Sequence, residues 1–586
     1  MEPSASDFFE ALERSARNAP ESATQADTVF KFVLAGTHGG AWLVDLTKGK
    51  RSGFVARLPD ATSEPASHPE EAPEPAATIH VDASDWVAMT TGKMNPMRAF
   101  MSGKIKVDGD IKLAVNLPIV VNMVDGYGIG TQGPITVMRT AIENTVANLR
   151  QPLPAISPMP PRTSGGLPLM RAGRRLLRNP TAFFTGCRDE MGDTFVVDAF
   201  GYRLFCVFSA AGVRSLWALP EEVASKALAD LSLLSHKAPV ELFEGRRTFP
   251  HDLFAKDDVQ AYLGNLQRAV DLELEELGDT GVFEAFAFAK RLAHRMGLAS
   301  WGGAEAASAK YLPRLATLFD RLDMSESFVH PHKALLTIAT RKARERAAMH
   351  EIEEIFAEIL RARTTMSSTT EEGLFERICE SWAHVPSPDR EVGIARDVIV
   401  IHMGSQSNLF AAMAWTLIFL LDHPEVVERV RSGDDSILNP FSHEAIRMTQ
   451  RSIVLRRAVT PIDFDDGEQV YRLSPGTLVT TMVSVTNTTA APWLAEFDIS
   501  NYRGSVFLRS RELATPELVT TYGHGKHTCP AHRFSTSAIT QALGELVRRF
   551  DLDPRYEDPN PRPRQLGGVA RADRACPIAY SRRDAP

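Results

Sequence analysis

The chain has 586 residues, of which 44% are hydrophobic and 24% charged, and its formal net charge is −8. This is the composition of a globular protein long enough for several domains, and the acidic balance excludes a protein that binds nucleic acid through a basic surface. Five scattered cysteines with no C-x-x-C pair argue against a zinc site and a disulfide framework, and they favour a reducing compartment.

Two features bear on membranes. The first residues, M-E-P-S-A-S-D-F-F-E, lack the charged-then-apolar pattern of a secretory signal. The most apolar stretch, residues 398–421, is interrupted by polar side chains such as His402 and Ser405, which predicts a buried helix and not a lipid-exposed span. We therefore expect a soluble, cytoplasmic protein without a transmembrane anchor.

The first part of the chain predicts a small α/β domain. Residues 6–17 have the spacing of an amphipathic helix, with Phe8 and Phe9 on its apolar face. Residues 30–34 alternate between large apolar and other side chains, as in a strand. Residues 104–115 predict a β-hairpin that turns at Asp108-Gly109.

This order of elements, together with T-G-K-M-N-P-M-R-A-F-M-S-G-K-I-K-V-D-G-D, resembles the sterol carrier protein 2 (SCP2) domain. The resemblance covers about residues 5–120 and implies a sheet covered by helices around a lipid-holding tunnel. Methionine and aromatic side chains fill irregular apolar spaces, and five of them are candidates to line the tunnel: Trp86, Met94, Met97, Phe100 and Met101. The alternative for each is an ordinary core residue.

A proline-rich stretch follows. Residues 151–168 contain six prolines, which favours a stiff linker into the next domain. We therefore place the SCP2-like carrier domain at residues 1–125, the linker at 126–168 and a larger domain at 169–586.

The larger domain is predicted to be mainly helical with a small β region. Helical apolar periodicity is found in five long segments: 258–277, 282–299, 309–321, 333–362 and 391–421. The last of them carries the polar run M-G-S-Q-S-N at residues 403–408. Further on, Glu444 and Arg447 stand three residues apart, where two side chains share a helix face and can pair.

One cysteine stands out near the C-terminus. Residues 522–531 read Y-G-H-G-K-H-T-C-P-A, so that Cys529 lies in a glycine-bearing loop before an apolar helix. Glycines let a backbone approach a flat ligand closely, and a lone thiolate in such a loop is a ligand for haem iron. The alternative is a buried structural cysteine in an ordinary turn.

These motifs together resemble the cytochrome P450 family, whose haem-binding loop reads F-x-x-G-x-[HR]-x-C-x-[GA]. The resemblance implies a mainly α-helical fold that binds haem b, with Cys529 as the axial metal ligand. It also places the other residues of the loop against the cofactor: Tyr522, Gly523, Gly525 and His527. Tyr522 stands where phenylalanine is usual.

The same resemblance gives roles to residues outside the loop. Glu444 and Arg447 match a structural pair that shapes the cysteine side of the haem. An arginine usually completes that pair, and this chain has Asn501 in its place, with Arg503 two residues further on. Arg456 and His527 match positions that bind haem propionates, for which charged donors are suited; the alternative for both is a surface charge.

The polar run in the long helix departs from the common pattern. Most monooxygenases of the family carry an acid–alcohol pair there, which delivers protons, but residues 403–408 contain no Asp or Glu. The sequence S-Q-S-N instead resembles the branch of the family that holds sterol 7-alpha-hydroxylases and prostacyclin synthase. We assign Gln406, Ser407 and Asn408 as catalytic residues that face the oxygen-binding side of the haem.

The resemblances imply a haem monooxygenase that uses O2 to hydroxylate a sterol, a steroid or another fatty lipid supplied by the carrier domain. No glycine motif for flavin or nicotinamide is visible, so electrons from NAD(P)H are expected through a separate ferredoxin and ferredoxin reductase. Two alternatives stay open: an isomerase or peroxygenase that acts on lipid peroxides without a reductase, and a non-catalytic protein that binds lipid and haem. Residues that contact the lipid are expected within 230–345.

Overall fold

The computed structural model describes residues 5–18, 28–37, 39–48, 50, 52–58, 74–90, 104–109, 153–163, 172–234, 237–243, 245–254, 259–323, 342–365 and 373–584. They divide into two compact units, one made mainly of residues up to 148 and the other made mainly of the residues after it. Four of the predicted tunnel residues, Met94, Met97, Phe100 and Met101, lie outside the described residues.

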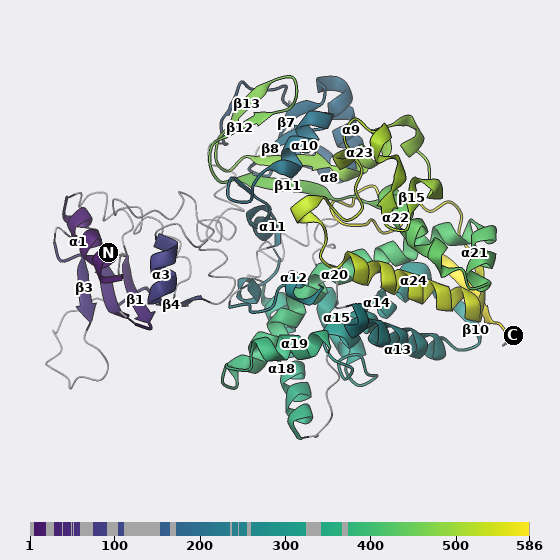
Figure 1. Ribbon diagram of the computed structural model, residues 1–586, viewed down its shortest axis with the longest axis horizontal. Helices are drawn as coiled ribbons and strands as arrows, with labels where there is room; N and C mark the ends of the chain where they lie inside the picture. The colour runs from purple at the N-terminus through teal and green to yellow at the C-terminus, as the bar shows by residue number, and fades with distance from the viewer. Residues whose placement is uncertain are drawn as a thin grey trace. The chain divides into compact units, whose positions relative to one another are not determined.

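The N-terminal unit is a five-stranded sheet with two described helices (Figure 1). Its strand order is β3-β2-β1-β4-β5, in which β1 and β4 run parallel and the other neighbours antiparallel. The elements are α1 (Ala5–Asn18), β1 (Val29–Ala35), β2 (Gly40–Asp45), β3 (Val55–Leu58), β4 (Ala77–Asp82), α3 (Ala83–Thr90) and β5 (Ile105–Gly109).

Aromatic side chains form the core of this unit. Phe8 and Phe9 of α1 are buried, as the amphipathic pattern predicts. The Phe9 ring stacks on Trp42 at 4.5 Å between centroids, and Phe8 meets the edge of Trp86 at 5.3 Å. Trp86 is fully buried, and no described residue accepts a hydrogen bond from its indole N–H.

The turn predicted at Asp108-Gly109 is wrong. Both residues belong to β5, where they pair with Thr78 and Ala77 of β4. Pairing with β4 extends the strand through the dipeptide, because a ladder of backbone hydrogen bonds outweighs the turn preference of two residues. The second strand of the predicted hairpin, residues 111–115, lies outside the described residues.

The second unit is mainly helical (Figure 1). Its helices of six or more residues are α8 (Gly173–Arg178), α9 (Pro180–Met191), α10 (Ala210–Ala218), α11 (Lys226–Leu234), α13 (Val259–Leu277), α14 (Ala285–Trp301), α15 (Leu312–Leu322), α18 (Ala343–Thr365), α19 (Leu374–Ser381), α20 (Asp389–Leu421), α21 (Pro424–Arg431), α22 (Leu438–Thr449), α23 (Val483–Thr489) and α24 (His532–Arg549). The longest, α20, contacts α14, α18, α22 and α24.

Its strands form small sheets. One has the order β7-β8-β14-β11-β9, a second β12-β13-β6, a third β10-β18-β17 and a fourth β15-β16. The bounds are β6 (Ile156–Ser157), β7 (Thr194–Ala199), β8 (Tyr202–Val207), β9 (Ala224–Ser225), β10 (Thr280–Glu284), β11 (Ile453–Ala458), β12 (Ile462–Asp465), β13 (Val470–Leu473), β14 (Leu478–Met482), β15 (Tyr502–Arg503), β16 (Val506–Phe507), β17 (Phe550–Pro554) and β18 (Pro577–Arg582).

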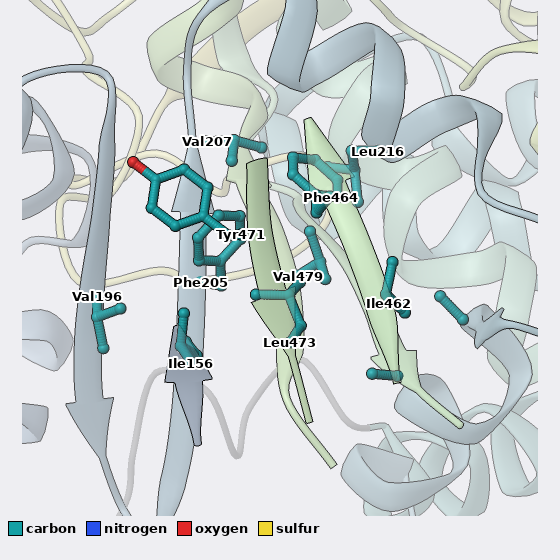
Figure 2. Packing of buried hydrophobic residues seen from close by; sticks show 12 residues of the cluster. Ile156, Val196, Phe205, Val207, Leu216, Ile462, Phe464, Tyr471, Leu473 and Val479 are labelled. Carbon is teal, nitrogen blue, oxygen red and sulfur yellow. The ribbon is translucent and has the colours of Figure 1, made fainter. Parts of the chain in front are cut away.

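Part of the predicted linker belongs to this β region. Ile156 pairs with Leu473 of β13 and is buried in an apolar cluster with Phe205 and Tyr471 (Figure 2). Arg203 donates to the backbone carbonyl of Pro154 at 2.7 Å. Proline suits an edge strand, since its missing N–H leaves no ladder bond unmade. The residues around β6 therefore attach the second unit's N-terminal end to its own sheet, and they do not act only as a spacer.

The predicted helices are largely confirmed. Segments 258–277, 309–321 and 391–421 match α13, α15 and α20 within a few residues. The segment at 282–299 begins differently, because residues 280–284 form strand β10 against β18 and α14 starts at Ala285. Glu284 caps α14 by accepting the backbone N–H of Ala287 at 2.8 Å. Residues 333–341 lie outside the described part of the chain.

Candidate functional site

The cysteine loop is closed by its own backbone. The N–H of Cys529 donates to the carbonyl of Tyr522 at 2.7 Å. Gly523 has a φ of +86°, and a Cβ placed on it would lie 2.3 Å from the carbonyl oxygen of His527. No other residue fits this position, because both the dihedral and the contact require glycine. Gly525 also has a positive φ, of +55°.

Cys529 is half-buried, and the pKa of its thiol lies above the ordinary value because burial outweighs two opposing influences. Burial raises the pKa of the Cys529 thiol, while the backbone N–H of Ala531, which donates to the sulfur, and the positive charge of Lys226 lower it. Among the described residues no group of three His, Cys, Asp or Glu could hold a metal ion. A haem would need only one thiolate from such a loop, since the porphyrin nitrogens already bind the iron, and the loop fits that requirement.

Tyr522 joins the loop to α22. Its ring lies edge-on to His443 of α22 at 5.4 Å between centroids. Its hydroxyl is buried and has no hydrogen-bond partner within the described part of the chain. Burial raises the pKa of Tyr522 above its ordinary value. The phenylalanine usual in this position would make the same ring contact without that hydroxyl.

Glu444 and Arg447 form a fully buried pair on α22. Arg447 donates to both oxygens of Glu444, at 2.7 and 2.6 Å, and neither side chain is exposed. Arg447 also donates to the backbone carbonyls of Asn487 and Leu494, at 2.6 and 2.7 Å. This is the arrangement that the i, i+3 spacing predicts, and the bonds show a structural role.

Asn501 completes this pair. Its side-chain amide donates to Glu444 Oε1 at 3.1 Å, and the backbone N–H of Asp498 donates to the same oxygen at 2.8 Å. Arg503 is exposed on β15. Asn501, which stands where the sequence comparison predicts an arginine, therefore donates to the Glu444 carboxylate from an amide and not from a guanidinium.

Arg456 is buried in strand β11. Its Nη1 lies 3.1 Å from Glu221 Oε2, and that carboxylate also accepts the backbone N–H groups of Lys226 and Ala227 at the start of α11. A guanidinium has five N–H donors, a chemistry suited to carboxylates. His527 lies in the cysteine loop, with its ring 6.5 Å from that of Trp217.

The polar run of α20 is divided between two faces of one unbroken helix. Asn408 and Gly404, four residues apart, share an exposed face, and a Cβ on Gly404 would meet nothing within 4 Å. Gln406 is 1% exposed and follows His402 by four residues on a different face. Among the residues that the structure describes, neither amide atom of Gln406 has a hydrogen-bond partner. Ser407 is half-buried between the two faces.

His402 takes part in a buried network that sequence reasoning missed. The indole N–H of Trp301 donates to His402 Nδ1 at 3.2 Å, and His402 Nε2 lies 2.8 Å from Nδ1 of His294. Burial and the neighbouring His294 lower the pKa of His402 well below its ordinary value. A histidine inside an apolar helix was the visible signal, but its partners on α14 are set by packing.

α20 is also long and apolar enough to cross a membrane by length and composition alone. Its most apolar window has a mean hydropathy of 1.2, and 67% of that window is buried inside the protein. The core helix of a folded domain passes the same test of length and composition. Among the described residues it is the one helix that meets the criterion.

Comparison with known proteins gives two family matches. Residues 8–120 match the SCP-2 sterol transfer family, and residues 338–575 match the cytochrome P450 family. The chain is 33% identical over 117 residues to hydroxysteroid dehydrogenase-like protein 2 of Xenopus laevis, covering 20% of this chain and 24% of that protein. It is 34% identical over 104 residues to the Homo sapiens protein of the same name, covering 18% and 21%. The chain thus spans about a quarter of the length of these relatives.

Proposed function

Because the chain carries an SCP-2 sterol transfer domain and a cytochrome P450 domain, we propose that it is a haem-thiolate monooxygenase that hydroxylates a sterol, a steroid or another lipid. When bound, haem with a thiolate ligand supplies activation of O2 and oxygen-atom transfer. The Cys529 loop is the observation that best supports this proposal, since its closure, its glycine requirement and the Ala531 N–H on the sulfur suit one metal-binding thiolate.

The residues on the cysteine side would hold the cofactor. Cys529 would bind the haem iron through its sulfur, and Arg456 and His527 would bind the propionates. The pair of Glu444 and Arg447 fixes α22 against the backbone of residues 487–498, which keeps the loop and the helix in register.

Asn408 is the polar group that we place on the oxygen-binding side. It shares the exposed face of α20 with Gly404, where the missing side chain leaves open space. An amide does not ionise near neutral pH, but it donates hydrogen bonds and holds water. Asn408 and Ser407 therefore position a water chain that carries the proton. Gln406 lies on the buried face of α20, away from the face that Asn408 shares with Gly404.

The N-terminal domain delivers the lipid. Joining a carrier to an enzyme raises the local concentration of an insoluble substrate without any new contact at the reaction site. The name of the relatives refers to hydroxysteroids, which favours a steroid or sterol. We further propose a cytoplasmic protein that receives electrons from NAD(P)H through a ferredoxin-type partner.

Replacing Cys529 by serine tests the proposal. The reduced wild-type protein with carbon monoxide should show the red-shifted Soret absorption of thiolate-bound haem, and Cys529→Ser should abolish it. Cys379, which is also half-buried, gives the matched control, and Cys379→Ser should leave the spectrum unchanged. A normal spectrum in Cys529→Ser, or none in the wild type, would show that the assignment is wrong.

A second candidate is an isomerase or peroxygenase that acts on lipid hydroperoxides. It is favoured by the absence of Asp and Glu from residues 403–408, since a peroxide substrate needs no external proton or electron. Turnover of a fatty-acid hydroperoxide without reductant, together with no hydroxylation when a ferredoxin system is added, would select it. Stable haem and lipid binding without turnover in either assay would instead favour a carrier or sensor.

A further inference from the structure

A loop near the C-terminus, residues 565–570, lies against α20 at Asn408. The backbone N–H of Val569 donates to Asn408 Oδ1 at 3.0 Å. A backbone N–H can only donate, so the atom that faces it must be the carbonyl oxygen of the amide. The Oδ1 atom of Asn408 therefore faces the loop, and the NH2 group of the same amide faces away from the Val569 N–H.

Gly568 makes this close approach possible. A Cβ on Gly568 would lie 2.4 Å from Asn408 Oδ1, a distance that real Cβ atoms do not show. Gly568 also has a φ of +64°, a conformation that L side chains rarely adopt. Any side chain at residue 568 must therefore displace either the loop or the Asn408 amide.

The loop is itself held firmly. The backbone N–H of Arg451 donates to the carbonyl of Gly568 at 2.7 Å, and Gly567 donates back to Arg451 at 2.8 Å. The side chain of Gln565, 2% exposed, donates to the carbonyl of Val569 at 3.0 Å. The loop is thus tied to residue 451, two positions after the end of α22.

A second contact joins the loop to α20. The indole N–H of Trp415 donates to the carbonyl of Ala570 at 2.5 Å, and Trp415 follows Asn408 by two helical turns on the same face. The helix and the loop are therefore connected at two adjacent loop residues, Val569 and Ala570, and the loop cannot shift along α20 without losing one of these bonds.

We propose that residues 565–570 orient Asn408 so that its NH2 group is presented to the oxygen-binding side as a hydrogen-bond donor. The proposal rests on the proposed haem function. Within the described residues, no hydrogen bond is shown for Asn408 Nδ2, and Asn408 is exposed. Because the carbonyl end is occupied, Asn408 stabilises negative charge and donates to water, and it does not accept a proton. Gly568 and Val569 are positioning residues that act through Asn408.

The test is a double-mutant cycle that joins Gly568→Ala to Asn408→Ala in the full-length haem protein. The readout is the C–O stretching frequency of the reduced carbon monoxide complex, which responds to a nearby donor, together with hydrogen peroxide released per NAD(P)H. Gly568→Ala should shift the frequency as Asn408→Ala does and raise peroxide release on the order of tenfold, the factor that corresponds to one lost hydrogen bond. In the Asn408→Ala background, Gly568→Ala should add nothing.

Gly504→Ala is the matched control. Gly504 has a φ of +57°, close to that of Gly568, but a Cβ there would meet nothing within 4 Å. This variant carries the same backbone strain without the contact, and its frequency should equal that of the wild type.

Three results would overturn the proposal. The first is a Gly568→Ala protein with the wild-type frequency. The second is an equal further shift when Gly568→Ala is added to Asn408→Ala. The third is that the Gly568→Ala single mutant and the double mutant both lose haem, while Gly504→Ala and Asn408→Ala retain it. Gly568 would then be needed for folding and not for the orientation of Asn408. Failure of the proposed function is distinguishable, because the wild type would then lack the thiolate-haem spectrum.

Discussion

Removing the Arg447 guanidinium should be among the most destabilising single changes in the second unit. Arg447→Ala leaves the fully buried Glu444 carboxylate without its cation. It also removes donors from three backbone carbonyls, those of Asn487, Leu494 and Glu496. The surrounding chain cannot supply a replacement charge, because the remaining donors to Glu444 are one amide and one backbone N–H.

The magnitude follows from these contacts. Breaking a buried ion pair by deleting one partner costs about 3–5 kcal/mol. Three carbonyls that lose their donors add roughly 1 kcal/mol each, less where water enters the space left by the side chain. The sum of about 3–8 kcal/mol compares with a total stability of about 5–15 kcal/mol for a typical domain. We therefore expect Arg447→Ala to unfold at much lower urea concentration and to retain little haem.

Urea unfolding of the full-length protein, followed by far-UV circular dichroism and by protease resistance, measures this loss. Arg555→Ala removes one partner of an ion pair with Asp553 in which both side chains are mostly exposed, and it should cost only about 0–1 kcal/mol. Replacing Glu444 and Arg447 together by leucine should be less damaging than Arg447→Ala, because no unpaired charge stays buried. A loss in Arg447→Ala no larger than that in Arg555→Ala would refute the reasoning.

Three further predictions test other parts of the protein. Residues 1–125 expressed alone should fold and bind a fluorescent fatty acid. Deleting them from the full-length protein should raise the KM for insoluble substrates and leave kcat nearly unchanged. A large loss of kcat at normal haem content would instead show that the domain has another role. Asn501→Ala should lower the free energy of unfolding, measured in urea, by about 1–3 kcal/mol, because Glu444 loses a buried donor. Arg503→Ala should change it by no more than about 0.5 kcal/mol. The reverse order would show that Arg503 is the partner of Glu444. The pKa of His402 lies well below its ordinary value of 6.5 in the folded protein. Below pH 6.5 His402 is therefore protonated in the unfolded chain while it stays neutral in the folded chain. The contribution of His402 to the free energy of unfolding should be constant above pH 6.5. Below that pH it should decrease by up to about 1.4 kcal/mol per pH unit. Urea titrations of His402→Gln at several pH values should lack this part of the slope, and an unchanged slope would contradict the burial argument.

Local patterns were sufficient to predict the features that depend on neighbours in the chain. The apolar periodicity predicted α13, α15 and α20, since one face of each helix must be buried. The i, i+3 spacing predicted the pair of Glu444 and Arg447, and the glycines around Cys529 predicted a loop that only glycine allows. In each of these the contact is made within a few residues, so the sequence contains the whole interaction.

The tertiary structure alone decided which distant residues meet. Asn501 and not Arg503 reaches Glu444, and β10 replaces the start of a predicted helix because β18, almost three hundred residues later, pairs with it. Asn408 contacts Val569 across 161 positions of sequence, and no periodicity in either segment signals that bond. The reason is physical: a helix or turn is stabilised by local backbone bonds, whereas a side chain's distant partner is set by how whole elements pack, and packing depends on every residue of both surfaces at once.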